Sequence, residues 1–183
     1  MIHSSKNNLN MKKIFLACLL PVVMYQPASI YNLTADKLGG GTINFNQYQG
    51  KRILLVNIST HSSQSAQLAE MEQLYQQHSS DLVVVAFPTN NFNTEPHSGA
   101  ALQSELANIS FPVAAPVNVT DAPTRHAVYQ WLASKTENGV MNAKVRGDFY
   151  KFLLDKQGKI VAFFDSTTSV LSPVVQNVLQ IHQ

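Results

Sequence analysis

The segment KRILLVNISTHSS, residues 51–63, begins with a short apolar run that only Asn57 interrupts, and it ends in a polar cluster. Short runs rich in β-branched and other apolar residues are typical of strands buried on both faces, as at the centre of an α/β sheet. The loop after such a strand lies at its carboxyl end, where open α/β sheets usually place their chemistry. We therefore expect a central strand here and a functional loop at residues 59–63.

The residues after this loop predict alternating helices and strands. A helix is expected to begin near Ser65, capped by a serine at 62, 63 or 65, and to bury residues at helical spacing: Leu68, Met71, Leu74 and Tyr75. LVVVAF at residues 82–87 predicts a second buried strand, which Pro88 ends. A polar loop (89–98), a short helix (99–109), an extended segment (111–119) and a helix (125–135) with Trp131 in the core are expected to follow.

Both ends of the domain predict hairpins. Strands at 149–154 and 159–164 are joined by DKQG, a hairpin signature. The closing helix is expected to begin near Pro173 and to bury four apolar residues: Val174, Val175, Val178 and Leu179. On the amino-terminal side, predicted strands at 29–35 and 42–45 flank a glycine turn at 39–41 and form an N-terminal β-hairpin. Together these elements predict an α/β fold.

Residues 1–28 predict an N-terminal extension and a signal peptide. Met11, Lys12 and Lys13 precede IFLACLLPVVMY, a basic region followed by an apolar region of signal-peptide length. The apolar region is too short for a comfortable transmembrane helix. Met11 is the better start, and Ala28 is a small residue suited to cleavage. We expect an exported protein, periplasmic or secreted, with one domain at residues 29–183 and no stable membrane insertion after cleavage.

The net charge and the cysteine count of the chain exclude some classes of partner and of catalytic chemistry. Three lysines and no acidic residue lie in the first 28 residues, so residues 29–183 hold ten basic and eleven acidic residues. A near-neutral domain gives no electrostatic case for binding nucleic acid or an anionic membrane. Cys18 is the one cysteine of the chain and lies in the predicted signal peptide. The domain therefore has no disulfide, no thiolate metal site and no cysteine nucleophile.

Several colinear segments resemble one family, the glutathione peroxidases. NQYQGKRILLVN (46–57) resembles that family's strand leading to its redox residue, and FPTNNFNTEP (87–96) resembles its second block, usually FPCNQFGGQEP. The segments FPV (111–113), YQWL (129–132), FYKFLL (149–154) and STT (166–168) follow in the family's order. The resemblance covers residues 29–183. It implies a thioredoxin-like fold of the glutathione peroxidase type, with a central mixed β-sheet flanked by helices.

The resemblance also implies a chemistry, thiol-dependent reduction of hydroperoxides in the response to oxidative stress. In that family a cysteine or selenocysteine attacks the peroxide, and glutathione or another thiol reduces the oxidised residue. Carried onto this sequence, the family's redox residue, glutamine, tryptophan and asparagine fall on Ser62, Asn91, Gly147 and Asp148. All four positions are substituted, and the cysteine of the FPC motif is Thr89.

These substitutions predict that the family's catalytic positions are non-functional here. A serine hydroxyl cannot pass through the sulfur oxidation ladder. A carboxylate at Asp148 would oppose the anion that the family stabilises. We expect a pseudoenzyme, a binding or structural protein without a cofactor, in which glutathione or another thiol is at most bound by family analogy and not turned over.

Two other chemistries use the same loops. His61 beside Ser62 suggests a hydrolase, but neighbours in an extended loop point apart and no nucleophile-elbow glycines flank the serine. His61, His97 and Asp148 suggest a metal site, but their spacing matches no familiar ligand motif, so no metal is predicted. The alternative function is thus an enzyme of another type, with His61, Ser62, Asn91 and Asp148 in a remodelled polar pocket, or residual peroxidase activity at a non-thiol centre. A plain interaction module is a third alternative.

Overall fold

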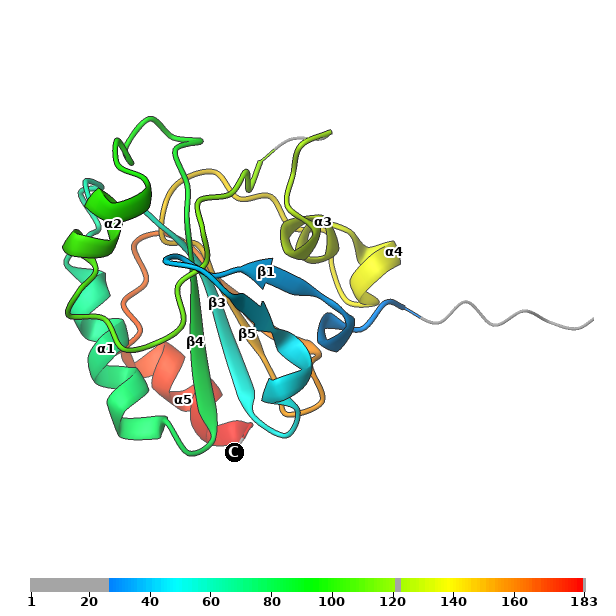
Figure 1. Cartoon of the computed structure of the whole chain (residues 1–183). Coiled ribbons are helices and arrows are strands. Elements are labelled where there is room, and N and C mark those ends of the chain that lie inside the picture. The colour runs from blue at the N-terminus through cyan, green and yellow to red at the C-terminus, as the bar shows by residue number, and fades with distance from the viewer. Residues whose placement is uncertain (1–26, 121–122, 183) are drawn as a thin grey trace, which may run out of the picture.

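A computed structural model of the protein describes residues 27–120 and 123–182. These residues form a central sheet with helices on both faces (Figure 1). The predicted signal segment within residues 11–28 lies outside the described residues except for Pro27 and Ala28. None of the helices in the described part of the chain combines the length and the apolar character needed to cross a bilayer.

The central sheet is mixed, as predicted. Its four strands have the spatial order β4-β3-β5-β6, in which β3 runs parallel to β4 and antiparallel to β5, and β5 pairs antiparallel with β6. The strands are β3 (Arg52–Ile58), β4 (Leu82–Pro88), β5 (Lys151–Leu154) and β6 (Ile160–Phe164). Every residue of β3 and β4 is buried. The apolar run at residues 51–63 thus forms an interior strand, as its composition predicts.

Helices cover the two faces of the sheet, and Figure 1 shows α1 and α5 on one side and α3 and α4 on the other. They are α1 (Gln67–His78), α2 (Gly99–Glu105), α3 (Ala127–Ala133), α4 (Lys135–Asn138) and α5 (Pro173–Ile181). Side chains alternate along β3, so Ile53 and Leu55 join the core under α3 whereas Leu54, Val56 and Ile58 join the core under α1 and α5.

The N-terminal hairpin is shorter than predicted. β1 (Thr34–Asp36) pairs antiparallel with β2 (Thr42–Asn44) in a separate two-stranded sheet. The predicted first strand was too long, because Ile30–Asn32 forms a 3-10 turn, η1, in which Ser29 Oγ accepts from the Tyr31 backbone N–H. A second 3-10 turn, η2 (Phe45–Tyr48), leads from the hairpin towards β3.

Several helix details also differ from the prediction. α1 begins at Gln67 with Ala66 as its capping residue and no side-chain cap, so the predicted serine cap is wrong. α2 ends at Glu105 instead of continuing to 109. α5 begins at Pro173 as predicted, but Val174 is 54% exposed. Val175 and Leu179, four residues apart on one helix face, are its buried residues.

Trp131 lies in the core, 4% exposed, as predicted. Its indole Nε1 donates a hydrogen bond to the carbonyl oxygen of Ala28 at 2.7 Å. This bond attaches the first described residues of the chain to α3.

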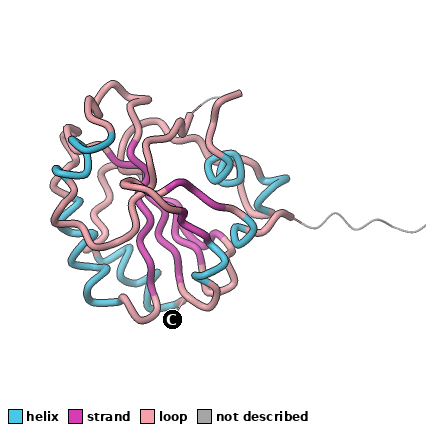
Figure 2. The backbone as a smooth tube through the Cα atoms, viewed as in Figure 1, coloured by secondary structure: helices cyan, strands magenta, loops and turns pink. Residues whose placement is uncertain are grey.

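Loops make up most of the chain between β4 and β5, as Figure 2 shows in pink. Because β3 and β4 are parallel and β5 is antiparallel to β3, the loops after β3 and β4 and the loop before β5 meet at one end of the sheet. This is the end at which the sequence predicts the chemistry.

Candidate functional site

Asn57 in β3 organises the end of the sheet where these loops meet. It is fully buried, and its side-chain Nδ2 donates to the Gly147 carbonyl at 2.9 Å. Its Oδ1 accepts from the Tyr150 backbone N–H at 3.2 Å, and its own carbonyl accepts from the Phe149 N–H at 2.7 Å. Phe149 has a φ of 60°, a left-handed conformation uncommon for a bulky residue. Asn57 therefore holds a strained turn that carries Asp148.

Ser62 and Asp148 lie next to each other at this end. Ser62 is 8% exposed and Asp148 is 6% exposed. Thr94 Oγ1 donates to Asp148 Oδ2 at 2.6 Å, whereas Asp148 Oδ1 is buried and has no well-aligned donor among the residues that the structure describes. Burial raises the pKa of the Asp148 carboxyl, hydrogen bonding from Thr94 and Ser62 opposes this shift, and the charge of Glu95 adds to it. The serine hydroxyl thus faces a carboxylate that is costly to ionise.

Asn91 and Gly147 hold the loops in place and present no functional group to Ser62. Asn91 Oδ1 accepts from the Val119 backbone N–H at 2.7 Å and from Thr89 Oγ1 at 2.9 Å, so it fastens two loop segments together. At Gly147 a Cβ atom would meet only Tyr150, at 3.7 Å, and the glycine's carbonyl is used by Asn57. Of the four predicted positions, the structure brings together Ser62 and Asp148.

His61 and His97 also meet at this end, but their carboxylate neighbour is Glu105 rather than Asp148. His61 Nε2 lies 3.2 Å and His97 Nδ1 lies 2.7 Å from Glu105 Oε1. The two imidazole rings contact each other with their centroids 5.0 Å apart. Interactions with Thr60, His61 and His97 lower the pKa of the Glu105 carboxyl. The His61 ring is therefore directed to Glu105, which argues against it as a base for Ser62.

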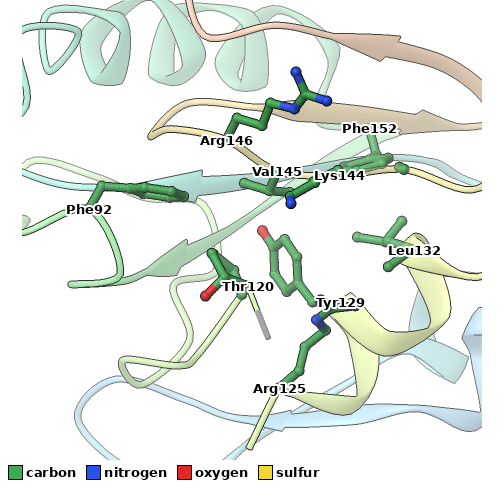
Figure 3. Close-up of a pocket in the computed structure, with 12 residues that line it drawn as sticks. Phe92, Thr120, Arg125, Tyr129, Leu132, Lys144, Val145, Arg146 and Phe152 are labelled. Atoms are coloured by element: carbon green, nitrogen blue, oxygen red, sulfur yellow. The ribbon is translucent and has the colours of Figure 1, made fainter. Parts of the chain in front are cut away.

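A cavity of about 360 Å³ opens beside these loops (Figure 3). Its wall is mostly apolar and includes Phe92, Val119, Leu132, Val145 and Phe152. Phe92 follows Asn91 in the chain and Arg146 precedes Gly147, so the cavity adjoins the predicted site positions.

Three basic side chains and one phenol add polar groups to this wall: Arg125, Lys144, Arg146 and Tyr129. The Tyr129 hydroxyl points into the space between the labelled side chains in Figure 3, and it has no hydrogen-bond partner among residues 27–120 and 123–182. Burial raises the pKa of Tyr129 well above its usual value, so the hydroxyl remains a neutral donor. The cavity thus combines apolar surface with positive charge and an unused buried donor.

Comparison with known proteins identifies the family. The sequence profile of the family described as glutathione peroxidase matches residues 30–133. The chain belongs to the glutathione peroxidase family. A glutathione peroxidase-like peroxiredoxin of Chlamydomonas reinhardtii, GPX5, is 32% identical over 158 residues, which cover 81% of this chain and 95% of that protein.

Solved structures of glutathione peroxidases share the fold. The crystal structure of Trgpx in its apo form has a TM-score of 0.65 at 24% identity, covering 85% of this chain and 95% of that one. The crystal structure of T. cruzi GPX1 has a TM-score of 0.62 at 20% identity, covering 84% and 94% of the two chains. The predicted thioredoxin-like α/β fold is confirmed.

Sequence reasoning missed two features of this glutathione peroxidase scaffold. Glu105 ends a short helix, eight residues after His97 and 44 after His61, and no familiar ligand spacing links it to them. The three basic residues of the cavity come from separate segments around α3 and before β5, so their proximity depends on the tertiary fold. The polar loop at residues 89–98, which carries His97, was the one available sequence signal near the first feature, since long polar loops often carry function.

Proposed function

We propose that this protein is a glutathione peroxidase family member that does not catalyse thiol-dependent reduction of hydroperoxides. The observation that carries the proposal is the residue at the family's redox position, Ser62. A serine oxygen has no accessible state equivalent to sulfenic acid, so it cannot accept oxygen from a peroxide and return it as water. Because Cys18 is the chain's one cysteine, the domain offers no substitute thiol.

The charge beside Ser62 supports the same proposal. A peroxidatic thiolate needs hydrogen-bond donors or positive charge around it. Asp148 supplies a carboxylate, with Glu95 as a second acidic group near it. Asn91, at the position of the family's glutamine, uses its side-chain oxygen to bind backbone and Thr89. The polar neighbours are therefore arranged for structure and not for an anionic nucleophile.

We place this protein outside the cytoplasm as part of the proposal. The basic and apolar regions at residues 11–28 support export, with Met11 as the start and a cleaved signal peptide. The mature domain, residues 29–183, would then act in the periplasm or as a secreted protein. Mass spectrometry of the protein purified from the extracytoplasmic fraction of its host tests this. A mature N-terminus near Ser29 is expected, and an intact N-terminus in the cytosolic fraction would contradict it.

A binding role is the second candidate function, and the cavity favours it. Lys144 and Arg146 beside apolar walls suit a small anionic molecule with an apolar part, and Tyr129 offers it a hydrogen bond. Glutathione, an anionic thiol used by the family, is the first compound to test. We expect saturable glutathione binding that Arg146→Ala weakens and that Lys159→Ala, at an exposed lysine outside the cavity, leaves unchanged. Equal binding by all three proteins would remove this cavity from consideration.

Hydroperoxide turnover tests the main proposal. The full chain and its Cys18→Ser variant are assayed with glutathione and with thioredoxin as reductants, beside Ser62→Cys and Ser63→Cys in the Cys18→Ser background. We expect the first two proteins to be silent and Ser62→Cys to gain slow turnover. Ser63→Cys is the matched control, because Ser63 is the exposed neighbour of Ser62. Peroxide-dependent thiol oxidation by the Cys18→Ser protein would overturn the proposal and require a non-thiol centre.

A further inference from the structure

Three side chains from separate parts of the chain converge at the loop end of the sheet. His61 follows β3, His97 lies in the long loop after β4, and Glu105 is the last residue of α2. Their three nearest ligand atoms, one imidazole nitrogen from each histidine and one carboxylate oxygen, lie within 4.8 Å of one another. We call this group the His-His-Glu cluster. Among the described residues it is the one such group of histidine, cysteine and acidic side chains.

A buried carboxylate holds both histidine-bearing segments in place. Glu95 is 3% exposed, and its Oε2 accepts from the Thr60 backbone N–H at 2.7 Å. Its Oε1 accepts from the Thr60 hydroxyl at 3.2 Å and from the His97 backbone N–H at 3.2 Å. The residue before His61 and the backbone of His97 are therefore fixed to one side chain. This arrangement resembles the outer-shell support that orients metal ligands in proteins.

Within the cluster both imidazole nitrogens converge on one carboxylate oxygen, and one of the two contacts, from His61, is an aligned hydrogen bond. His97 Nδ1 is buried and lies 2.7 Å from Glu105 Oε1, yet within the described part of the chain it makes no aligned hydrogen bond. His61 Nε2 lies 3.2 Å from the same oxygen. Two ligand atoms on a tetrahedral Zn²⁺ with bonds of about 2.0–2.1 Å are roughly 3.3 Å apart. The two nitrogen–oxygen distances, 2.7 and 3.2 Å, are close to this value, and all three atoms lie within 4.8 Å of one another, so small side-chain rotations would place them around one small cation.

We propose that His61 Nε2, His97 Nδ1 and the Glu105 carboxylate bind one divalent cation of the zinc type. Two imidazoles and one carboxylate are a ligand set typical of Zn²⁺ sites that keep an open position. Both histidines and the glutamate are partly exposed, so the ion can enter from solvent and its fourth position faces water. The site lies outside the Ser62–Asp148 pair. Because Zn²⁺ has no redox chemistry, the proposal stands independently of whether Ser62 supports peroxide reduction.

Metal titration of the full-length protein tests the site. Zn²⁺ is titrated by calorimetry after chelator treatment, into the natural chain and into the His61→Ala, His97→Ala and Glu105→Gln variants. We expect one ion per chain and an affinity at least about tenfold weaker in each variant. His78→Ala is the matched control, because His78 ends α1 outside the cluster, and it should bind as the natural protein does.

Cobalt spectroscopy adds a readout that a structural role would not change. Co²⁺ in the His-His-Glu cluster should give visible d–d bands without a thiolate charge-transfer band, since the three ligands are nitrogen and oxygen. Thermal unfolding of the metal-free variants checks that they remain folded. Absence of Zn²⁺ binding by the folded natural chain at millimolar metal would overturn the proposal. So would equal affinity in all variants, or a charge-transfer band that Cys18→Ser removes.

Discussion

The side-chain amide of Asn57 donates to the carbonyl of Gly147, 90 residues further along the chain. This bond connects the carboxyl end of the central strand to the turn that carries Asp148 next to Ser62. A polar residue in a buried strand would ordinarily weaken the sheet. Here its Nδ2 and its Oδ1 both have backbone partners, so Asn57 acts as an internal tether between two of the loops at the candidate site.

Removing this tether should destabilise the protein. Asn57→Ala leaves the Gly147 carbonyl and the Tyr150 N–H without their partner inside the protein, and we expect a loss of about 2–4 kcal/mol of unfolding free energy. Urea unfolding monitored by circular dichroism measures this. Asn108→Ala is the control, because Asn108 is exposed. A change as small as the control's would mean that Phe149 and its strained turn hold their position without Asn57.

Neutralising Asp148 should stabilise the protein at neutral pH. Because burial raises the pKa of Asp148 in the folded state, ionisation costs folding free energy once the pH exceeds that pKa. Asp148→Asn removes this cost, and we expect a gain below about 1 kcal/mol at pH 7, since hydrogen bonds from Thr94 and Ser62 already offset part of the cost of burial. The gain should fall as the pH is lowered and vanish below the usual carboxyl pKa of about 4. Unfolding curves at several pH values show whether the difference follows this course or stays constant.

Lys151 gives the opposite dependence on pH. It is fully buried in β5, where burial lowers its pKa to about 8, although Asp165 and Glu70 favour the charged form. The folded state therefore holds fewer protons than the unfolded state between pH 8 and 10.5, so stability rises with pH in that window.

Lys151→Met should accordingly be more stable than the natural protein at pH 7. The shift corresponds to about 3 kcal/mol, but the carbonyls of Phe149 and Asp165 lose a donor, so we expect a net gain of about 1–2 kcal/mol. The gain should shrink between pH 8 and pH 10. Lys159→Met serves as the control for the loss of one surface charge, because Lys159 is exposed. A Lys151→Met protein that is less stable at pH 7 would show that the two carbonyl contacts outweigh the buried charge.

The effect of the Asp148 carboxylate on position 62 should be measurable as the pKa of a thiol introduced there. In Ser62→Cys with Cys18→Ser, the Asp148 carboxylate should raise the thiol pKa, because like charges disfavour the thiolate. Adding Asp148→Asn should lower that pKa and speed iodoacetamide alkylation at neutral pH several-fold. Alkylation rates measured from pH 5 to 10 give the thiol pKa with and without the Asp148→Asn substitution. Ser63→Cys should not respond to Asp148→Asn, and an equal pKa in the two Ser62→Cys proteins would contradict the electrostatic argument.

The main elements of the fold could be predicted because their signals are local. The apolar run in β3, the hairpin at Asp155 and the proline that starts α5 each depend on a few neighbouring residues. The errors occur where a single hydrogen bond decides the conformation. Ser29 draws the predicted first strand into a 3-10 turn. Ser62 uses its hydroxyl to accept from Gln64 at 3.3 Å, and it therefore does not cap α1.

The candidate site could be predicted in part. His61 and His97 follow adjacent parallel strands, so their meeting follows from sheet topology. The third member, Glu105, depends on where α2 packs, which cannot be read from the sequence. Ser62 and Asp148 were paired by family resemblance, and the structure places them side by side. Asn57 positions Asp148 next to Ser62 through three hydrogen bonds to the loop before β5, and these hydrogen bonds have no sequence signature.

The bond from Trp131 to Ala28 provides an optical signal for processing of the chain. Trp131 is the one tryptophan of the protein, and its indole N–H donates to a carbonyl that a cut after Ala28 would turn into the end of the removed peptide. Such a cut frees the indole to bind water and should shift its fluorescence emission to longer wavelength. A cut further upstream leaves the bond and the emission unchanged. Tryptophan fluorescence thus reports, in unlabelled protein, on which side of Ala28 the chain is cleaved.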